Sequence, residues 1–524
     1  MPNSLAIIRA LLIYGLCLPA AIFLGYLLAT PLDWMSFVLI LLLVFVPLVP
    51  VLLRWHHFLL IASWNLSAVL FFLPGRPFMW VVMTFISLVL STTQRILSRE
   101  TTHISVPSVA RPLLFLLLVT FATALLTGGI GVAALGSEVY GGRRYIMILA
   151  AVLGFFAMSR VRVPPGRETL YASVFFLMGI TAIIGALPGF IYIPPALYFL
   201  FAIFPIESLQ LVFFDPSEDA PMRLSSLAPA GNALVCYCLA RYGLRGTLAL
   251  NEGLHLLPFR FRGSFQIQQP WRLILVLLAL WVGLSSGFRS ALVFFMVLFA
   301  MMFFMEGLHR SPALPALILV GLLGAAVVVP FASKLPPNVQ RALSFLPLDI
   351  DPVIRMNADY STEWRVQMWQ SILPSVPKYL LLGKGYAIDP TDLERAQYGK
   401  AGESALGAMI AGDYHNGPLT LLIPLGIWGA IAFLWFLVAS FRVLWNNYRY
   451  GDPALHRVNS FLLVYFVART LFYFFVFGSF SSELYLFTGV VALSISLNGG
   501  VRQPVGAPAV KPVFGTLPLA RATQ

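Results

Sequence analysis

Residues 313–333 read ALPALILVGLLGAAVVVPFAS, a run without a charged side chain. A helix needs about 20 apolar residues to cross the hydrocarbon core of a bilayer, so this run is long enough to span it. Similar runs recur along the 524-residue chain, which is 59% hydrophobic and only 10% charged. Soluble globular proteins carry about 25% charged residues. The sequence therefore predicts an all-α polytopic membrane protein with about 12–14 transmembrane helices.

The candidate spans share an apolar run bounded by polar or basic residues, and they lie at 11–29, 34–53, 58–73, 78–92, 112–135, 145–159, 170–189, 232–248, 271–287, 290–308, 313–333, 416–440, 459–478 and 484–498. The apolar stretch 191–213 contains prolines and Glu207, so it is a span, a re-entrant piece or an interfacial helix. The formal net charge is +13. Because Lys and Arg lie in short loops on one side of the spans, this charge indicates cytoplasmic loops, and no nucleic-acid partner is predicted.

A polar segment, residues 335–414, interrupts the spans late in the chain. It holds seven basic and nine acidic residues, whereas the loops assigned to the cytoplasm are basic. The segment therefore belongs on the opposite, periplasmic or extracellular face. The pair Arg143-Arg144 falls on that same face, against the rule. The predicted organisation is N-terminal transmembrane helices (1–213), central transmembrane helices (214–334), a large outer helical loop (335–414), C-terminal transmembrane helices (415–498) and a disordered cytoplasmic tail (499–524).

Two arginines are candidates for chemistry at this outer face. Arg289 follows Ser286-Gly287-Phe288 between two apolar runs, and an arginine at membrane depth is costly unless it has a partner. The alternative is an arginine that only extends to the membrane surface. Arg365 stands four residues before Trp369, so one helix face carries both. The alternative for Arg365 is a solvated charge paired with Glu363.

His415 stands where the polar segment meets the next apolar run. An unperturbed imidazole titrates near pH 6.5, so a neutral one can accept a proton. The alternative is a histidine that caps a helix, but Asn416 is the better cap because its side chain can bond the backbone N–H groups after Pro418. Arg223, in the outer loop 214–230, is a weaker candidate by itself.

Three arginines and one histidine thus fall on one face of the predicted membrane protein. Guanidinium groups bind phosphate oxygens in a bidentate manner. A cationic pocket with one neutral base suits glycosyl transfer from a lipid diphosphate sugar, because the cations stabilise the leaving diphosphate and the base takes the hydroxyl proton. The group Asp389, Asp392 and Glu394 is read as acidic loop surface in preference to a divalent-ion site. No metal and no cofactor are predicted.

Ordered motifs follow one another within residues 223–430: Ser286 to Arg289, Arg365 with Trp369, the turn Gly383-Lys384-Gly385, and His415-Asn416 followed by Leu419, Gly426 and Gly429. In this order they resemble the O-antigen ligase/polymerase superfamily. The stretch from Arg223 to Asn232 resembles the family's arginine loop only loosely, because the usual glycine and Asn-Pro are absent.

The resemblance implies a GT-C-type fold and an inverting, metal-independent glycosyltransferase of the bacterial inner membrane. It would take a glycan from undecaprenyl diphosphate at the periplasmic face. His415 would be the base, Arg289 and Arg365 would bind the diphosphate with Arg223 beside them, and Asn416, Trp369, Gly383 and Gly385 would support the site. The first prediction is an O-antigen ligase with lipid A–core as acceptor. The alternatives are a polymerase acting on another lipid-linked glycan, a protein O-oligosaccharyltransferase and a polysaccharide transporter.

Overall fold

The computed structural model describes residues 34–73, 75–97, 104–131, 140–206, 223–248, 270–388, 390–391 and 412–504, together with residues 21, 22 and 25. The chain divides into two compact units, residues 1–59 and 60–524. Most of helix α2 (Trp34–Ser63) belongs to the first unit. The predicted span 11–29 falls almost entirely outside the described residues. Glu207, the acidic group Asp389, Asp392 and Glu394, and the tail from residue 505 also lie outside them.

Every regular element among the described residues is helical. The longer helices of the second unit are α3 (Met79–Leu97), α4 (Pro107–Leu126), α5 (Gly142–Ser159), α6 (Glu168–Leu177), α9 (Leu227–Thr247), α10 (Pro270–Ser285), α11 (Arg289–Met305), α12 (Ala313–Val328), α18 (Gly417–Tyr450), α19 (His456–Phe475) and α20 (Phe480–Asn498). Within the described ranges, seven helical stretches are long and apolar enough to cross a membrane, and four apolar helices are shorter. The predicted all-α polytopic membrane protein is confirmed.

The stretch 58–73 departs from the prediction of a separate span. Helix α2 runs through its first part and ends at Ser63, and the described residues 64–73 and 75–78 that follow form no helix. Asn65 Nδ2 donates to the Phe175 carbonyl at 2.8 Å, and the Ser67 N–H donates to Thr181 Oγ1 at 3.1 Å. These polar contacts hold the loop against α6 and η2 (Met178–Ala182), where Trp64, Ala68 and Val69 are buried, whereas Phe71 and Phe72 are exposed. The hydrophobicity of the first part of the loop therefore reflects burial and not a membrane crossing.

Two later apolar stretches, 170–189 and 191–213, are not continuous helices in their described parts. Residues 170–189 begin as α6 and continue as η2 (Met178–Ala182), α7 (Ile183–Ala186) and η3 (Leu187–Gly189), and together they remain a candidate span. In the described part of 191–213 only η4 (Pro195–Leu197) and α8 (Phe199–Ile203) form. The prolines fix the backbone and remove N–H donors, so no continuous helix develops there.

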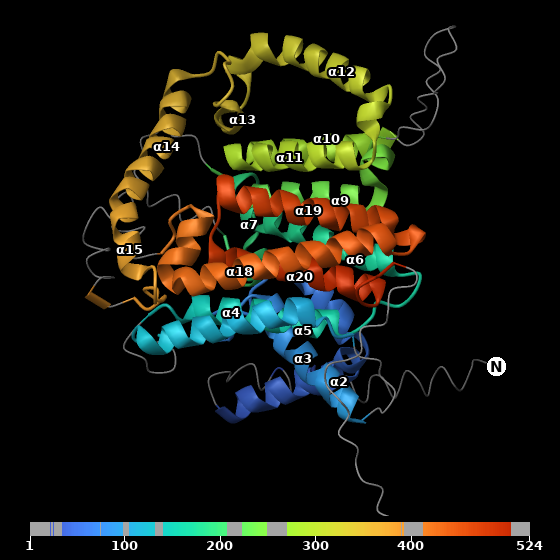
Figure 1. Ribbon diagram of the computed structural model, residues 1–524, viewed down its shortest axis with the longest axis vertical. Coiled ribbons are helices and arrows are strands. Elements are labelled where there is room, and N and C mark those ends of the chain that lie inside the picture. The colour runs from blue at the N-terminus through green and yellow to red at the C-terminus, as the bar shows by residue number, and fades with distance from the viewer. Residues whose placement is uncertain are drawn as a thin grey trace, which may run out of the picture. The chain divides into compact units, whose positions relative to one another are not determined.

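The core of the second unit is built on α18, α19 and α20, which lie side by side (Figure 1). Helix α5 packs along α20, and α4 packs along α18. Two glycines allow α5 and α20 to approach the buried ring of Trp64, because a Cβ at Gly154 or Gly489 would lie 2.4 or 2.1 Å from that ring. Small residues at such contacts are typical of membrane helices. By contrast, none of the most apolar 18-residue window of α12 is buried.

The polar segment forms its own helices, α13 (Pro337–Leu343), α14 (Pro352–Ile372), η8 (Leu373–Ser375) and α15 (Val376–Tyr379). Asp351 caps α14, because its Oδ1 accepts from the Val353 N–H at 2.8 Å. Leu373 and Pro374 follow directly after α14, where η8 begins. The predicted helix around Arg365 and Trp369 is confirmed, and it runs across the ends of the core helices, at a steep angle to them (Figure 1).

The glycine turn after α15 attaches this segment to α18. Gly426, with φ +65°, breaks α18, and Pro424 lacks an N–H, so carbonyls near the break need other donors. The Lys384 N–H donates to Ile423 O at 2.7 Å, and the Gly385 N–H donates to Pro424 O at 2.9 Å. A Cβ at Gly383 would lie 2.2 Å from Pro424 O. Glycine is required here for close backbone contact, which fixes the polar segment against the start of α18.

Candidate functional site

Arg289 is the first residue of α11 and follows the turn at Gly287, whose φ is +76°. Its Nη2 donates to the Ala358 carbonyl at 2.6 Å and to Thr362 Oγ1 at 2.8 Å, both on α14. The side chain therefore does not simply extend toward solvent, as the alternative reading expected. It joins the end of a membrane helix to the polar segment.

Two further arginines adjoin this turn. The Leu224 N–H donates to Ser286 O at 3.3 Å, which holds Arg223 beside the turn, and the Arg223 Cζ lies 6.0 Å from the centre of the Phe288 ring. Arg341, on α13, is only 3% exposed. Its Nη1 donates to Gly287 O at 2.8 Å, and its Nε donates to Asn357 Oδ1 at 3.2 Å.

The arginines are close enough to destabilise one another's charge. Burial lowers the pKa of Arg223, and Arg365 and Arg289 lower it further. Burial and Arg289 likewise lower the pKa of Arg365, against an opposing effect of Asp413. Burial together with Arg223, Arg289 and Arg365 lowers the pKa of Arg341 to about 9. Four guanidinium groups gathered with little compensating negative charge form a site that favours an anion with several oxygens.

His415 lies in a tight turn and has a left-handed φ of +49°, which is uncommon outside glycine. Its Nδ1 is 3.4 Å from Asp413 Oδ1 and is buried without a closer acceptor among the described residues. Its ring lies between Trp364 and Phe477, with centroid distances of 5.5 and 5.4 Å. Because Nδ1 faces the carboxylate, Nε2 is the nitrogen left to accept a proton.

The Asp413 carboxylate is stabilised in its ionised form. Burial alone would raise the pKa of this carboxyl, but hydrogen bonding and charge from His415, together with the charge of Arg144, hold it below its usual value. Arg144 belongs to the pair that broke the charge rule, and its Cζ lies 5.8 Å from the Tyr386 ring. Arg144 thus lies beside the polar segment, whereas the Arg143 Cζ lies 5.4 Å from the centre of the Phe78 ring.

Both neighbours of His415 are fixed by side-chain hydrogen bonds. Trp369 Nε1 donates to the Tyr414 carbonyl at 2.8 Å, which ties α14 to the turn. Asn416 Oδ1 accepts from the Leu419 N–H at 3.1 Å, so Asn416 is the N-cap of α18, as predicted. Met368, Tyr414 and Leu419 pack in one buried cluster beneath the turn. These contacts hold the His415 imidazole beside the C-terminal part of α14, which follows Arg365.

The structure brings together Arg223, Arg289, Arg365 and, through Asp413, His415. It places Gly383 and Gly385 in the backbone contact with α18. Sequence reasoning missed Arg341 and Asp413 as site residues. Asp413 carried a local signal, because it stands two residues before His415; Arg341 carried none, because its burial depends on how α13 packs.

A comparison with protein families finds one match for this part of the chain. Residues 274–434 match the family model described as O-antigen ligase. The matched region contains Arg289, Arg341, Arg365 and His415. The resemblance to the O-antigen ligase/polymerase superfamily is confirmed over these residues. The match supports a glycosyltransferase-like function of the O-antigen ligase or polymerase type in a multi-pass membrane protein. No curated protein matches the chain.

Proposed function

We propose that the protein transfers a glycan from undecaprenyl diphosphate to a hydroxyl acceptor at the periplasmic face of the bacterial inner membrane, as an O-antigen ligase. The observation that carries this proposal is the gathering of four arginines, of which Arg289, Arg341 and Arg365 lie together with His415 inside the region matched to the O-antigen ligase family. Such a site combines anion binding with one base at a membrane helix end.

The proposed reaction is a single displacement that inverts the anomeric carbon. His415 Nε2 takes the proton from the acceptor hydroxyl as the acceptor oxygen bonds to the anomeric carbon. The bond from that carbon to the phosphate oxygen breaks, and undecaprenyl diphosphate leaves with the electron pair. Arg289, Arg341 and Arg365 stabilise the negative charge that develops on the diphosphate. Asp413 orients the imidazole and stabilises the imidazolium.

The matched motifs leave the acceptor open. Lipid A–core would make the protein a ligase, another lipid-linked glycan a polymerase, and a protein hydroxyl an oligosaccharyltransferase. A transporter would be expected to place ionisable groups along a path through the spans. The arginines instead gather with the outer segment, and Arg469, within α19, has Glu483 as its partner at 4.0 Å. Transport therefore ranks below transfer.

The test compares surface glycan on gels from the source organism carrying wild type, a deletion, His415→Ala or Arg289→Lys. We expect His415→Ala to match the deletion although the protein remains folded. Arg289→Lys should also fail, because an ammonium group cannot reproduce the bidentate fork. Arg442→Lys, at an exposed position at the opposite end of α18, is the matched control.

The gel pattern also separates the acceptors. Unmodified core with accumulated long lipid-linked chains indicates a ligase, and core capped by single repeats indicates a polymerase. If His415→Ala behaved like wild type while the deletion did not, His415 would not be the base. If Arg289→Lys worked at the wild-type rate, binding of the diphosphate by Arg289 would be wrong.

A further inference from the structure

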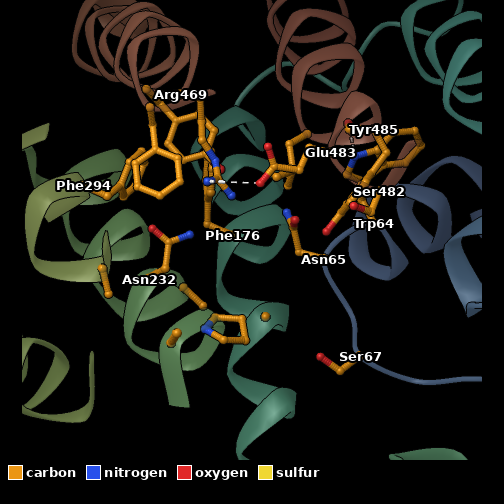
Figure 2. A pocket seen from close by; sticks show the side chains of 18 of the residues that line it. Trp64, Asn65, Ser67, Phe176, Asn232, Phe294, Arg469, Ser482, Glu483 and Tyr485 are labelled. Carbon is orange, nitrogen blue, oxygen red and sulfur yellow. Dashed lines mark hydrogen bonds and ion pairs between the residues drawn. The ribbon is translucent and has the colours of Figure 1, made fainter. Parts of the chain in front are cut away.

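A cavity of about 480 Å³ lies among the helices next to the candidate site (Figure 2). Its volume falls within the range of about 300–1,000 Å³ that is usual for small-molecule sites. It is lined from the loop after α2 and from α3, α5, α6, α9, α11, α19 and α20. None of the arginines of the anion site and neither His415 nor Asp413 is among its lining residues.

One wall of the cavity carries a partly buried ion pair. Arg469 Nη1 lies 4.0 Å from Glu483 Oε1, and the two side chains are 17% and 14% exposed (Figure 2). The Arg469 Nε has no hydrogen-bond partner among the described residues. Charged groups within membrane helices are costly and mark functional sites by default. The pair has no net charge, so it would not attract a phosphate as the arginine cluster does.

The other walls combine aromatic rings with neutral polar groups. Trp80 stacks on Tyr485 at 5.0 Å with an interplanar angle of 16°, and Trp64 lies 5.2 Å from Trp80. Asn65 and Asn232 face the same space (Figure 2). A pyranose ring has apolar C–H faces that pack on aromatic rings and hydroxyls that bond amides, carboxylates and guanidinium groups. An acyl chain would leave the Arg469 Nε, which has no hydrogen-bond partner among the described residues, still without one.

The cavity shares walls with the candidate site on two sides. Phe477 lines it, and the ring of Phe477 lies 5.4 Å from that of His415. Phe288 also lines it, and the ring of Phe288 is in contact with the Arg223 guanidinium at 6.0 Å. A sugar in the cavity would therefore sit next to both the base and the anion site, where a glycan being transferred must lie.

We infer that this cavity binds an uncharged sugar residue of the transferred or accepting glycan, held between the Trp64, Trp80 and Tyr485 rings and the Arg469–Glu483 pair. The inference rests on the proposed glycosyl transfer for its choice of glycan. Two sources supply such a sugar, the lipid-linked donor and the acceptor. The cavity would select the glycan, while the arginines bind its diphosphate.

The test measures saturation-transfer NMR on the purified full-length protein with two probes. One probe is the oligosaccharide released from the lipid-linked donor by mild acid, and the other is the free acceptor oligosaccharide. Ala228→Phe fills the cavity from the first turn of α9. Ala326→Phe, on the unburied surface of α12, is the matched control. Ser67→Phe fills the cavity from a loop if Ala228→Phe does not purify as a folded protein.

We expect ring C–H signals from one probe with wild type, with Ala326→Phe and with His415→Ala, and loss of those signals when the cavity is filled. A signal from the donor probe assigns the cavity to the donor glycan, and a signal from the acceptor probe assigns it to the acceptor. No signal from either probe, or a signal that persists in the filled cavity or disappears equally in the control, would overturn the inference. Because His415→Ala keeps the cavity, this result is independent of whether His415 is the base.

Discussion

The hydrogen bond from Trp369 to the turn before His415 offers the sharpest test of how the base is positioned. Trp369→Phe keeps an aromatic ring in the buried cluster and removes only the Nε1–H that donates to the Tyr414 carbonyl at 2.8 Å. Tyr414 is 3% exposed, so water replaces the lost donor poorly. A buried carbonyl without its partner costs about 1–3 kcal/mol.

If the free energy of this lost hydrogen bond destabilises the turn that holds His415 in its reactive position, the rate of transfer decreases by about 5- to 150-fold. The assay is transfer by the purified protein with lipid-linked donor at varied concentration. We expect kcat to fall and the KM for the donor to remain unchanged, because the arginine cluster does not depend on Trp369. Trp428→Phe, at a position 48% exposed on α18, is the control for loss of a tryptophan.

A kcat within twofold of wild type for a folded Trp369→Phe protein would refute this reasoning. So would a raised KM for the donor at unchanged kcat, because that result would assign Trp369 to donor binding and not to the His415 turn.

Three further predictions concern the turn and its attachment. Asp413→Asn should lower kcat, because the imidazolium that forms on His415 during transfer loses its anionic partner; an unchanged kcat would argue against the pair. The pKa of the Asp413 carboxyl in the folded protein lies below the usual value for aspartate. The ionised carboxylate therefore stabilises the fold at any pH above that usual value, and this stabilisation is lost only as the pH falls through the lowered pKa. Between pH 5 and 8 the wild-type protein should thus show no loss of stability from Asp413. Gly383→Ala should lower the thermal stability by about 1–3 kcal/mol or more, because a Cβ at φ +79° would lie 2.2 Å from Pro424 O. Gly321→Ala, which meets nothing within 4 Å, should leave the melting temperature unchanged or higher, and equal melting temperatures for the two variants would contradict the role of the turn.

Local sequence patterns were sufficient to predict the membrane-protein class, the helix that carries Arg365 and Trp369, and the N-cap at Asn416. Each depends on apolar runs or on residues three or four apart, which the sequence displays directly. The loop after Ser63 was misread because a hydropathy pattern does not separate a buried loop from a membrane helix. The conformation of this loop depends on a hydrogen bond from Asn65 to the Phe175 carbonyl, 110 positions away.

The same limit applies to the candidate site. Arg289, Arg365 and His415 could be chosen because motif and position agreed, and they remain predictions as catalytic groups. Arg341 could not be identified as a site residue from the sequence, because its burial and its hydrogen bond to Gly287 depend on how α13 packs against α14 and the neighbouring helices. The cavity could not be foreseen either, because its ion pair joins Arg469 and Glu483 across two helices, and neither residue stands in a motif.

The unburied helix α12 has a mechanical consequence. A helix with no protein around its apolar window takes its depth and tilt from the thickness of the bilayer and not from packing. Only the short helix η7 (Val329–Lys334) and two residues separate its end from α13, which carries Arg341. Because Arg341 is bonded to Gly287 O, α13 is held at the turn between α10 and α11, and a thicker or thinner membrane would strain the link through η7 that joins α12 to α13. Lipid composition would therefore act on the anion site as tension along this link.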